Sequence, residues 1–296
     1  MNNVTEKNNN IIITGQSDFN LTHIFECGQC FRFDKDETGA YIGTAYGKTI
    51  KISHTADAIT LHQTSMSDFN EIWRHFLDLD RDYSKIKAEL TKNGDFVMET
   101  AVRCGDGIRI LRQDLWETII SFIISASNNI PRIKKIIALL CENFGEKHEY
   151  AGKYYYSFPT PEKIASLDIS DLSAIRAGFR DKYILACARD IVSGKTDLDE
   201  IRKKTTSDAK AALMNMSGIG NKVSDCILLF GLNRFDSFPI DVWIKRVMEF
   251  CYFNTAEQSI KTISDFASER FGELGGIAQQ YLFFYARENK IGINKD

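Results

Sequence analysis

The pattern of apolar and polar residues changes character near residue 105. Between residues 11 and 64, short stretches rich in β-branched and aromatic residues alternate with the turn sequences DETG, YGK and HTAD. These stretches predict antiparallel strands at residues 29–33, 40–46, 49–53 and 59–62. A helix is expected at about 67–78, with an apolar face formed by Ile72, Trp73, Phe76 and Leu77.

Beyond residue 105 the strand signals stop, and helical periodicity with capping residues takes over. Asp114 and Glu117 form a capping box before LWETIISFIISAS. Pro131 is expected at the first position of the next helix, which ends before Gly145. Further helix starts are expected at Thr160–Pro161, Ser170, Asp181 and Asp241.

The chain of 296 residues is long enough for two domains. The pattern predicts an α+β fold, in which residues 1–104 form a small antiparallel β-rich N-terminal domain with flanking helices. That domain packs on an all-α body formed by residues 105–296, whose last long helix is expected at about 275–287. On that helix, Gln279 and Phe283 lie four residues apart on one face.

The composition, with 44% apolar and 26% charged residues, is that of an ordinary soluble protein. No apolar run approaches the roughly 20 residues that a membrane helix needs. The N-terminal sequence MNNVTEKNNN has no apolar core of a signal peptide, so a cytoplasmic location is expected, at the nucleoid if the source is prokaryotic.

A net charge of −3 argues mildly against nucleic acid as a partner. Local basic clusters could nevertheless supply phosphate contacts. These clusters are Arg132, Lys134 and Lys135; Arg202, Lys203 and Lys204; and Lys245 and Arg246.

Seven cysteines, an odd number spread over the chain, are typical of reduced thiols in a cytosol. Cys27 and Cys30 form a CxxC sequence without a second pair, and two buried structural cysteines are favoured over a zinc or redox site. No group of four cysteines suggests an iron–sulfur cluster, and no side chain demands a metal ion or another cofactor. We therefore expect no cofactor.

The stretch MSGIGNKVSDCILLFGLNRFDSFPID at residues 216–241 carries the strongest chemical signal. Gly218 and Gly220 flank one residue in a turn between two helices, where positive φ angles would let a DNA phosphate approach backbone N–H groups. Lys222 follows at a helix start, where the macrodipole would lower the pKa of its amine and favour a nucleophile. The alternative is a surface lysine that contacts phosphate.

Two further residues of this stretch have both a structural and a chemical interpretation. Cys226 lies one helical turn after Lys222, and as an isolated cysteine it is typical of a small core residue. Asp241 is expected as an N-cap, which would also hold a catalytic carboxylate rigidly in place. Capping and catalysis are therefore compatible at Asp241.

The stretch resembles the helix–hairpin–helix and Gly/Pro-Asp signature (HhH-GPD) of base-excision DNA glycosylases, with the hairpin at about 208–232. Within that superfamily the chain is similar to the 8-oxoguanine DNA glycosylase/AP lyases. The similarity covers nearly the whole chain and includes GQCFRF at 28–33, ILRQDLWETIISFIISASNNIPRI at 110–133, GFRDKY at 178–183 and GGIAQQYLFFYAR at 275–287. It implies a TBP-like N-terminal domain and double-stranded DNA containing 8-oxoguanine as the substrate.

The resemblance implies roles for six residues. Lys222 matches the lysine that attacks C1′ and forms a Schiff base, which permits β-elimination of the 3′ phosphate, and Asp241 matches the aspartate that stabilises developing positive charge. The flipped base would stack between Cys226 and Phe283. Gln279 would bond its Watson–Crick edge, unless it is an exposed helix glutamine, and the carbonyl of Gly28 would accept the N7–H of 8-oxoguanine. A dipole from an ammonium–thiolate pair of Lys222 and Cys226 is a further hypothesis.

Other residues match positions that face the gap or the opposite base. Asn129, Arg132 and Arg180 belong to this set, and two arginines suit the acceptor edge of cytosine. Ser127 stands where the family has an asparagine, and Phe179 where it has a tyrosine, which predicts looser discrimination of the opposite base. Trp243 replaces a histidine, which changes the outer wall of the pocket.

Two other functions use the same glycine turn. A monofunctional alkylbase glycosylase generally lacks a lysine at the position of Lys222, and a non-enzymatic helix–hairpin–helix module has no need to pair the turn with Lys222 and Asp241. A nucleotide hydrolase is excluded, because the chain has no GxxxxGK[ST] loop. We expect a monomer that does not bind membranes.

Overall fold

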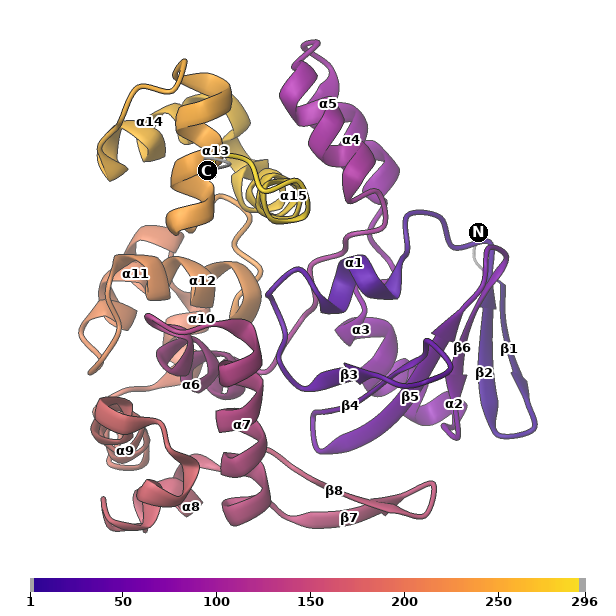
Figure 1. The fold of residues 1–296 in the computed structure, drawn as a ribbon. Coiled ribbons are helices and arrows are strands. Elements are labelled where there is room, and N and C mark those ends of the chain that lie inside the picture. The colour runs from indigo at the N-terminus through magenta and orange to yellow at the C-terminus, as the bar shows by residue number, and fades with distance from the viewer. Residues whose placement is uncertain (1–2, 293–296) are drawn as a thin grey trace.

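The computed structural model describes residues 3–292 and places a six-stranded antiparallel sheet in the first part of the chain (Figure 1). The strands run in the order β1-β2-β6-β5-β4-β3. Their bounds are β1 Asn3–Lys7, β2 Asn10–Thr14, β3 Phe33–Lys35, β4 Tyr41–Ala45, β5 Lys48–His54 and β6 Ala58–His62. The strands predicted at 40–46, 49–53 and 59–62 are therefore confirmed as β4, β5 and β6.

The strand predicted at 29–33 is wrong except at its end, because only Phe33 belongs to β3. Residues 29–32 form bends, and Gly28 precedes them with a φ of +78°. The hairpin of β1 and β2 was not predicted, because β1 is a polar edge strand with the sequence NVTEK. Asn8 and Asn9 form its turn, and their φ angles of 52° and 60° are typical of a type I′ hairpin turn.

Helices cover one face of this sheet and close its core. The predicted helix at 67–78 is present as α2 (Met66–Asp68), the π-helical turn Phe69–Trp73 and α3 (Arg74–Phe76). A short helix that was not predicted, α1 (Leu21–Phe25), begins at Asn20, whose side chain accepts from the N–H groups of its first turn. Phe25 of α1 stacks on Phe33, which joins α1 to β3.

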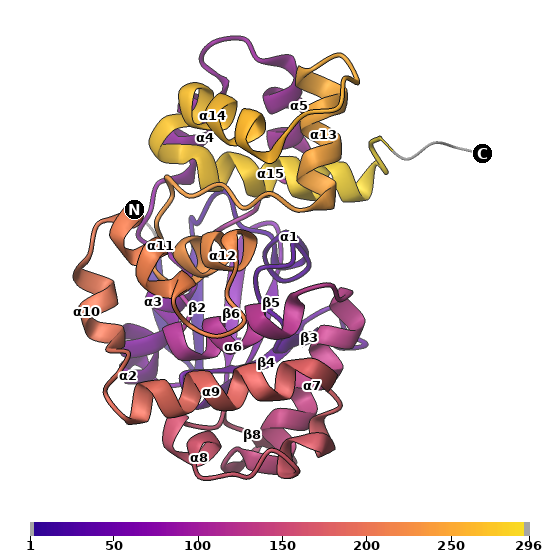
Figure 2. The same cartoon turned by 90° about the vertical axis from the view of Figure 1, so that its left-hand side faces the viewer.

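The helical body surrounds the apolar helix α6, in which every residue except Glu117 is buried (Figure 2). The bounds are α4 Tyr83–Thr91, α5 Phe96–Cys104, α6 Leu115–Ser125, α7 Ile130–Phe144, α8 Pro161–Ala165, α9 Asp181–Val192, α10 Leu198–Lys203, α11 Thr206–Met214, α12 Asn221–Gly231, α13 Val242–Tyr252, α14 Ile260–Phe271 and α15 Gly275–Glu288. Short 3₁₀ helices lie at Asp171–Ile175, Gly178–Arg180 and Gly272–Leu274.

Most of the predicted helix starts are confirmed. Asp114, Thr160 and Asp241 each accept a backbone N–H as N-caps. The capping box is only half formed, because the Glu117 carboxylate pairs with Arg32 at 3.3 Å instead of turning back to its own helix end. Ser170 makes no side-chain cap to the 3₁₀ helix that follows it, and Asp181 is the first residue of α9 rather than its cap. Pro131 is the second residue of α7.

A second sheet contradicts the expectation that strands stop at residue 105. Strands β7 (Lys147–Tyr150) and β8 (Lys153–Tyr156) form a two-stranded hairpin that runs along the N-terminal sheet (Figure 1). His148 bonds the Thr49 hydroxyl at 2.7 Å, and the Tyr150 hydroxyl donates to the carbonyl of His62 at 2.8 Å. The hairpin depends on these long-range partners, which local periodicity does not reveal.

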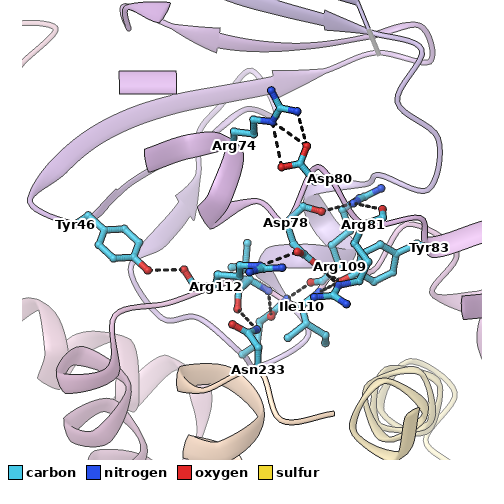
Figure 3. A network of polar contacts seen from close by, with 12 residues as sticks. Tyr46, Arg74, Asp78, Asp80, Arg81, Tyr83, Arg109, Ile110, Arg112 and Asn233 are labelled. Carbon is cyan, nitrogen blue, oxygen red and sulfur yellow. Dashed lines mark hydrogen bonds and ion pairs between the residues drawn. The ribbon is translucent and has the colours of Figure 1, made fainter. Parts of the chain in front are cut away.

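A buried polar network joins the two parts of the chain (Figure 3). The Arg109 guanidinium, which is 1% exposed, donates to the carbonyls of Asp18 and Asp78 at 2.9 and 2.7 Å. The Asp78 carboxylate accepts from Arg81, Tyr83 and Arg112 at 2.7, 2.9 and 2.8 Å. The network fixes the connecting segment that leads into α6.

The division between residues 104 and 105 stays a prediction. In the packing, α5 lies before that boundary but contacts α15 near the end of the chain (Figure 1). Within residues 3–292, no helix has the length and apolarity needed to cross a membrane.

Candidate active site

The glycine turn between α11 and α12 has two glycines with different requirements. Gly218 has a φ of +84°, and a Cβ atom there would lie 2.7 Å from Cγ of Tyr183. Gly220 is the N-cap of α12 with a φ of −101°, and no atom lies within 4 Å of the place of its Cβ. Gly218 therefore uses the positive φ that glycine permits, whereas Gly220 does not need it and is open to an approaching group.

A cavity of about 390 Å³ lies next to the first turn of α12 and brings together residues from five separate parts of the chain. Lys222 comes from the first turn of α12, Asp241 from the start of α13, Phe283 from α15 and Gly28 from the loop after α1. Asn129 also lines the cavity. Residues without a predicted role complete the lining, among them Phe122, Asn128 and Arg287. Arg287 follows Phe283 by one helical turn, so its spacing could have indicated it.

The Lys222 amine lies over the buried ring of Phe122, with Nζ 5.5 Å from the ring centroid. Burial by itself lowers the pKa of Lys222, but the nearby Cys226 and Asp241 stabilise the ammonium, and the net direction is upward. The lowered pKa predicted from the helix start is thus wrong, because Cys226 and Asp241 together outweigh the effect of burial.

Burial raises the pKa of the Cys226 thiol to about 11. The neighbouring Lys222 amine acts in the opposite direction and lowers the pKa of this thiol. The ammonium–thiolate dipole of Lys222 and Cys226 stays a hypothesis.

Asp241 is held by its own helix. Its Oδ1 atom accepts from the backbone N–H groups of Trp243 and Ile244, each at 2.9 Å. These bonds fix the carboxylate at the cavity wall and leave Oδ2 for another partner. Trp243 forms part of the same wall.

The other predicted pocket residues lie around or behind the cavity. The Phe283 ring faces Gly28, since a Cβ at Gly28 would lie 3.2 Å from Cε1 of Phe283. Cys226 and Gln279 are buried, with exposures of 3% and 4%, so the alternative of an exposed helix glutamine is wrong. The side-chain oxygen Oε1 of Gln279 accepts from the side-chain Nε2 of Gln280 at 3.0 Å.

The predicted gap residues gather at the turn between α6 and α7 and at the start of α9. Ser127 and Arg132 are exposed, and Ser127 has a left-handed backbone with a φ of 52°. Phe179 is 59% exposed. Arg180 is 4% exposed, and its guanidinium donates to the carbonyls of Ala126, Ala177 and Ser127 while lying 4.3 Å from the centroid of the Phe179 ring. In this structure Arg180 supports the turn rather than facing solvent.

The CxxC cysteines and the residues of the basic clusters do not line the cavity. Cys27 and Cys30 are both buried free thiols, as predicted, but they belong to two separate hydrophobic cores. Several of the basic residues pair with carboxylates, for example Lys134 with Asp34 at 2.8 Å. No group of three or more His, Cys, Asp and Glu side chains within residues 3–292 is arranged to hold a metal ion.

Comparison with known proteins shows two family matches. The N-terminal domain of 8-oxoguanine DNA glycosylases matches residues 11–119, and the HhH-GPD superfamily of base excision DNA repair proteins matches residues 120–271.

Relatives and solved structures agree with these matches. The N-glycosylase/DNA lyase of Saccharomyces cerevisiae is 38% identical over 166 residues, which span 52% of this chain and 44% of the yeast protein. A probable N-glycosylase/DNA lyase of Methanothermobacter thermautotrophicus is 30% identical over 209 residues, which span 62% of this chain and 65% of that protein. The chain thus spans under half of the first relative and just under two thirds of the second.

Two solved structures cover the chain more fully. The 8-oxoguanine glycosylase/lyase of Clostridium acetobutylicum, in complex with double-stranded DNA containing cytosine opposite 8-oxoguanine, has 41% identity and a TM-score of 0.94 over 98% of this chain and 99% of its own. MBOgg1 in complex with a low affinity DNA ligand has 44% identity and a TM-score of 0.95, with the same two coverages. The chain belongs to the HhH-GPD superfamily of base excision DNA repair proteins, in the branch that carries the N-terminal domain of 8-oxoguanine DNA glycosylases.

Proposed function

We propose that the protein is a bifunctional DNA glycosylase and AP lyase that excises 8-oxoguanine from duplex DNA through a Schiff base on Lys222. One observation carries the proposal: the fold assembles Lys222, Asp241, Gly28 and Phe283 around one cavity next to the first turn of α12. The relatives named N-glycosylase/DNA lyase support it.

The substrate would enter this cavity as a flipped nucleotide. Flipping costs a few kcal/mol, and less for a damaged base. The purine would lie between Cys226 and Phe283, with Gln279 at its Watson–Crick edge. The carbonyl of Gly28 would accept the N7–H that 8-oxoguanine has and guanine lacks. One such hydrogen bond contributes about 1–3 kcal/mol, so flipping and the electrostatics of the pocket must add to the selectivity.

The chemistry begins when Lys222 loses a proton and its Nζ attacks C1′. The new N–C1′ bond forms as the glycosidic bond breaks, and the electron pair of that bond leaves with the base, which takes up a proton. Asp241 would stabilise the positive charge that develops on the sugar. Opening of the sugar ring gives the imine, and removal of a C2′ proton then expels the 3′ phosphate.

The first experiment is a covalent trap. The protein is incubated with a duplex that holds 8-oxoguanine opposite cytosine, borohydride is added, and Lys222→Gln is run beside it. We expect a trapped complex that disappears in the variant. Base release without a trapped complex would instead favour water as the nucleophile, as in a monofunctional glycosylase, and DNA binding without activity would favour a plain binding module.

We further propose that discrimination of the opposite base is relaxed. Three features support this: Ser127 is too short to fill a vacated stack, Phe179 lacks a hydroxyl, and the donors of Arg180 are engaged by carbonyls. Cleavage rates of 8-oxoguanine opposite each of the four bases test it, with Ser127→Asn/Phe179→Tyr as the comparison. A strong preference for cytosine in the unaltered protein would contradict the proposal.

We propose a cytoplasmic monomer that acts on double-stranded DNA. Light scattering of the free protein and of its DNA complex tests the monomer, since one chain per duplex is expected.

A further inference from the structure

The side chain of Gln29, next to Gly28, is fully buried although it is polar, with an exposure of 0%. Its Nε2 atom donates to the carbonyls of Ile24 and Arg109 at 2.9 and 2.7 Å and lies 3.3 Å from Sγ of Cys27. Its Oε1 atom accepts from the backbone N–H of Leu111 at 2.9 Å. Every polar atom of this side chain therefore has a partner.

These partners lie on two different parts of the fold. Ile24 belongs to α1, whereas Arg109 and Leu111 belong to the connecting segment that leads into the helical body. That segment is itself held by the buried network around Arg109 (Figure 3). The backbone carbonyl of Gln29 also accepts from the side chain of Gln113 at 2.8 Å.

The loop that Gln29 anchors is held by side chains, since Phe31 packs edge-to-face on Phe122 and Arg32 pairs with Glu117 at 3.3 Å. Residues 27–32 form neither helix nor strand, so no regular ladder of backbone hydrogen bonds fixes them. Gly28 adopts a φ of +78°, a conformation that glycine takes up easily and can also leave easily. On the outer side, Arg287 donates to the carbonyl of Glu26 at 2.9 Å. On the inner side, the residues that flank Gly28 are held by the bonds of Gln29 and by the Cys27 thiol, which donates to the carbonyl of Ile24 at 3.3 Å.

We propose that Gln29 is a positioning residue of the base pocket, whose side-chain amide fixes the direction of the Gly28 carbonyl at the cavity wall. This inference rests on the proposed function, because the Gly28 carbonyl is the group that would recognise the N7–H of an oxidised purine. Gln29 does not line the cavity and so takes no part in the chemistry itself. A hydrogen bond weakens steeply as its geometry departs from linearity. A loosened loop would therefore slow the excision of 8-oxoguanine more than the cleavage of an abasic site.

The test compares two reactions of one protein. Excision of 8-oxoguanine needs the base to be recognised, whereas cleavage of a preformed abasic site needs Lys222 but no base. Both are measured under single turnover for the unaltered protein, for Gln29→Met and for Gln29→Glu. Methionine has a similar length and removes every polar contact, whereas glutamate retains the acceptor for Leu111.

A control variant accounts for lost stability. Thr44 is buried in the sheet, and its hydroxyl bonds that of Thr49 at 2.8 Å, away from the cavity. Thr44→Val therefore removes one buried hydrogen bond without touching the Gly28 loop. Thermal unfolding of all variants identifies any that fail to fold. Gln29→Met provides the milder change if Gln29→Glu does not fold, because glutamate places a buried carboxyl against the carbonyls of Ile24 and Arg109.

We expect the Gln29 variants to lose about tenfold in 8-oxoguanine excision, equivalent to about 1.4 kcal/mol, while abasic-site cleavage changes by less than about twofold. Thr44→Val should leave the ratio of the two rates unchanged. A parallel fall of both rates would show a merely structural role and overturn the inference, as would unchanged excision. If the unaltered protein cleaves abasic sites but not 8-oxoguanine, the proposed function itself fails, and that result is visible before any variant is made.

Discussion

Replacing Gly218 by alanine would place a methyl group in space that Tyr183 already fills. The new Cβ would lie 2.7, 2.8 and 2.9 Å from Cγ, Cβ and Cδ2 of Tyr183. The φ of +84° costs an L-residue about 1–2 kcal/mol, and overpacking typically adds about 1–3 kcal/mol. The reduced entropy of the unfolded chain offsets only about 0.4–1 kcal/mol of this. We therefore expect Gly218→Ala to lower the free energy of unfolding by about 2–4 kcal/mol.

Gly220→Ala is the matched control within the same turn. No atom lies within 4 Å of its new Cβ, and its φ of −101° suits any residue. Loss of a favoured N-cap residue and reduced entropy of the unfolded chain act in opposite directions, so the net change should stay below about 1 kcal/mol. Urea unfolding of the three proteins measures both changes. Equal stability of the two variants would refute the distinction between these glycines.

Three further predictions concern other parts of the structure. Asp78→Ala should lower the free energy of unfolding by about 3 kcal/mol in urea titrations, because the buried Tyr83 hydroxyl and the half-buried Arg81 and Arg112 lose their shared carboxylate. A loss below about 1 kcal/mol would contradict this. Ser127→Gly should raise the free energy of unfolding by about 0.5–1 kcal/mol, because a left-handed backbone with a φ of 52° strains serine. A lower free energy of unfolding for this variant would contradict that strain. A thiol reagent at pH 8, followed by mass spectrometry, should label Cys104 and Cys251, which are half-buried, before the fully buried cysteines. Burial raises the pKa to about 12 for the thiols of Cys27, Cys30, Cys141 and Cys187 and to about 11 for that of Cys226. Rapid labelling of Cys226 in the folded protein would show that its thiol is ionised.

The sequence by itself determined the features that depend on neighbours a few residues away. Caps such as Asp114 and Asp241 bond N–H groups two or three residues ahead, so their spacing is visible in the chain. The strands at 40–46, 49–53 and 59–62 are rich in β-branched and aromatic residues and are bounded by turn sequences, which are local features of the chain. The matching segments, from GQCFRF to GGIAQQYLFFYAR, likewise indicate the family. Each is a continuous run of residues, so it can be recognised without knowing how the chain folds.

The tertiary structure decided whatever depends on residues far apart in the chain. The hairpin of β7 and β8 is stabilised by bonds from His148 and Tyr150 to a sheet about a hundred positions earlier. Gly218 and Gly220 look alike in sequence, but only the former packs against Tyr183. The direction of the Lys222 pKa follows from charges in another helix as well as in its own, which no local dipole argument includes. Electrostatic and packing energies depend on the distance between atoms in space. The spacing of residues along the chain therefore did not predict these contacts or the direction of the Lys222 pKa.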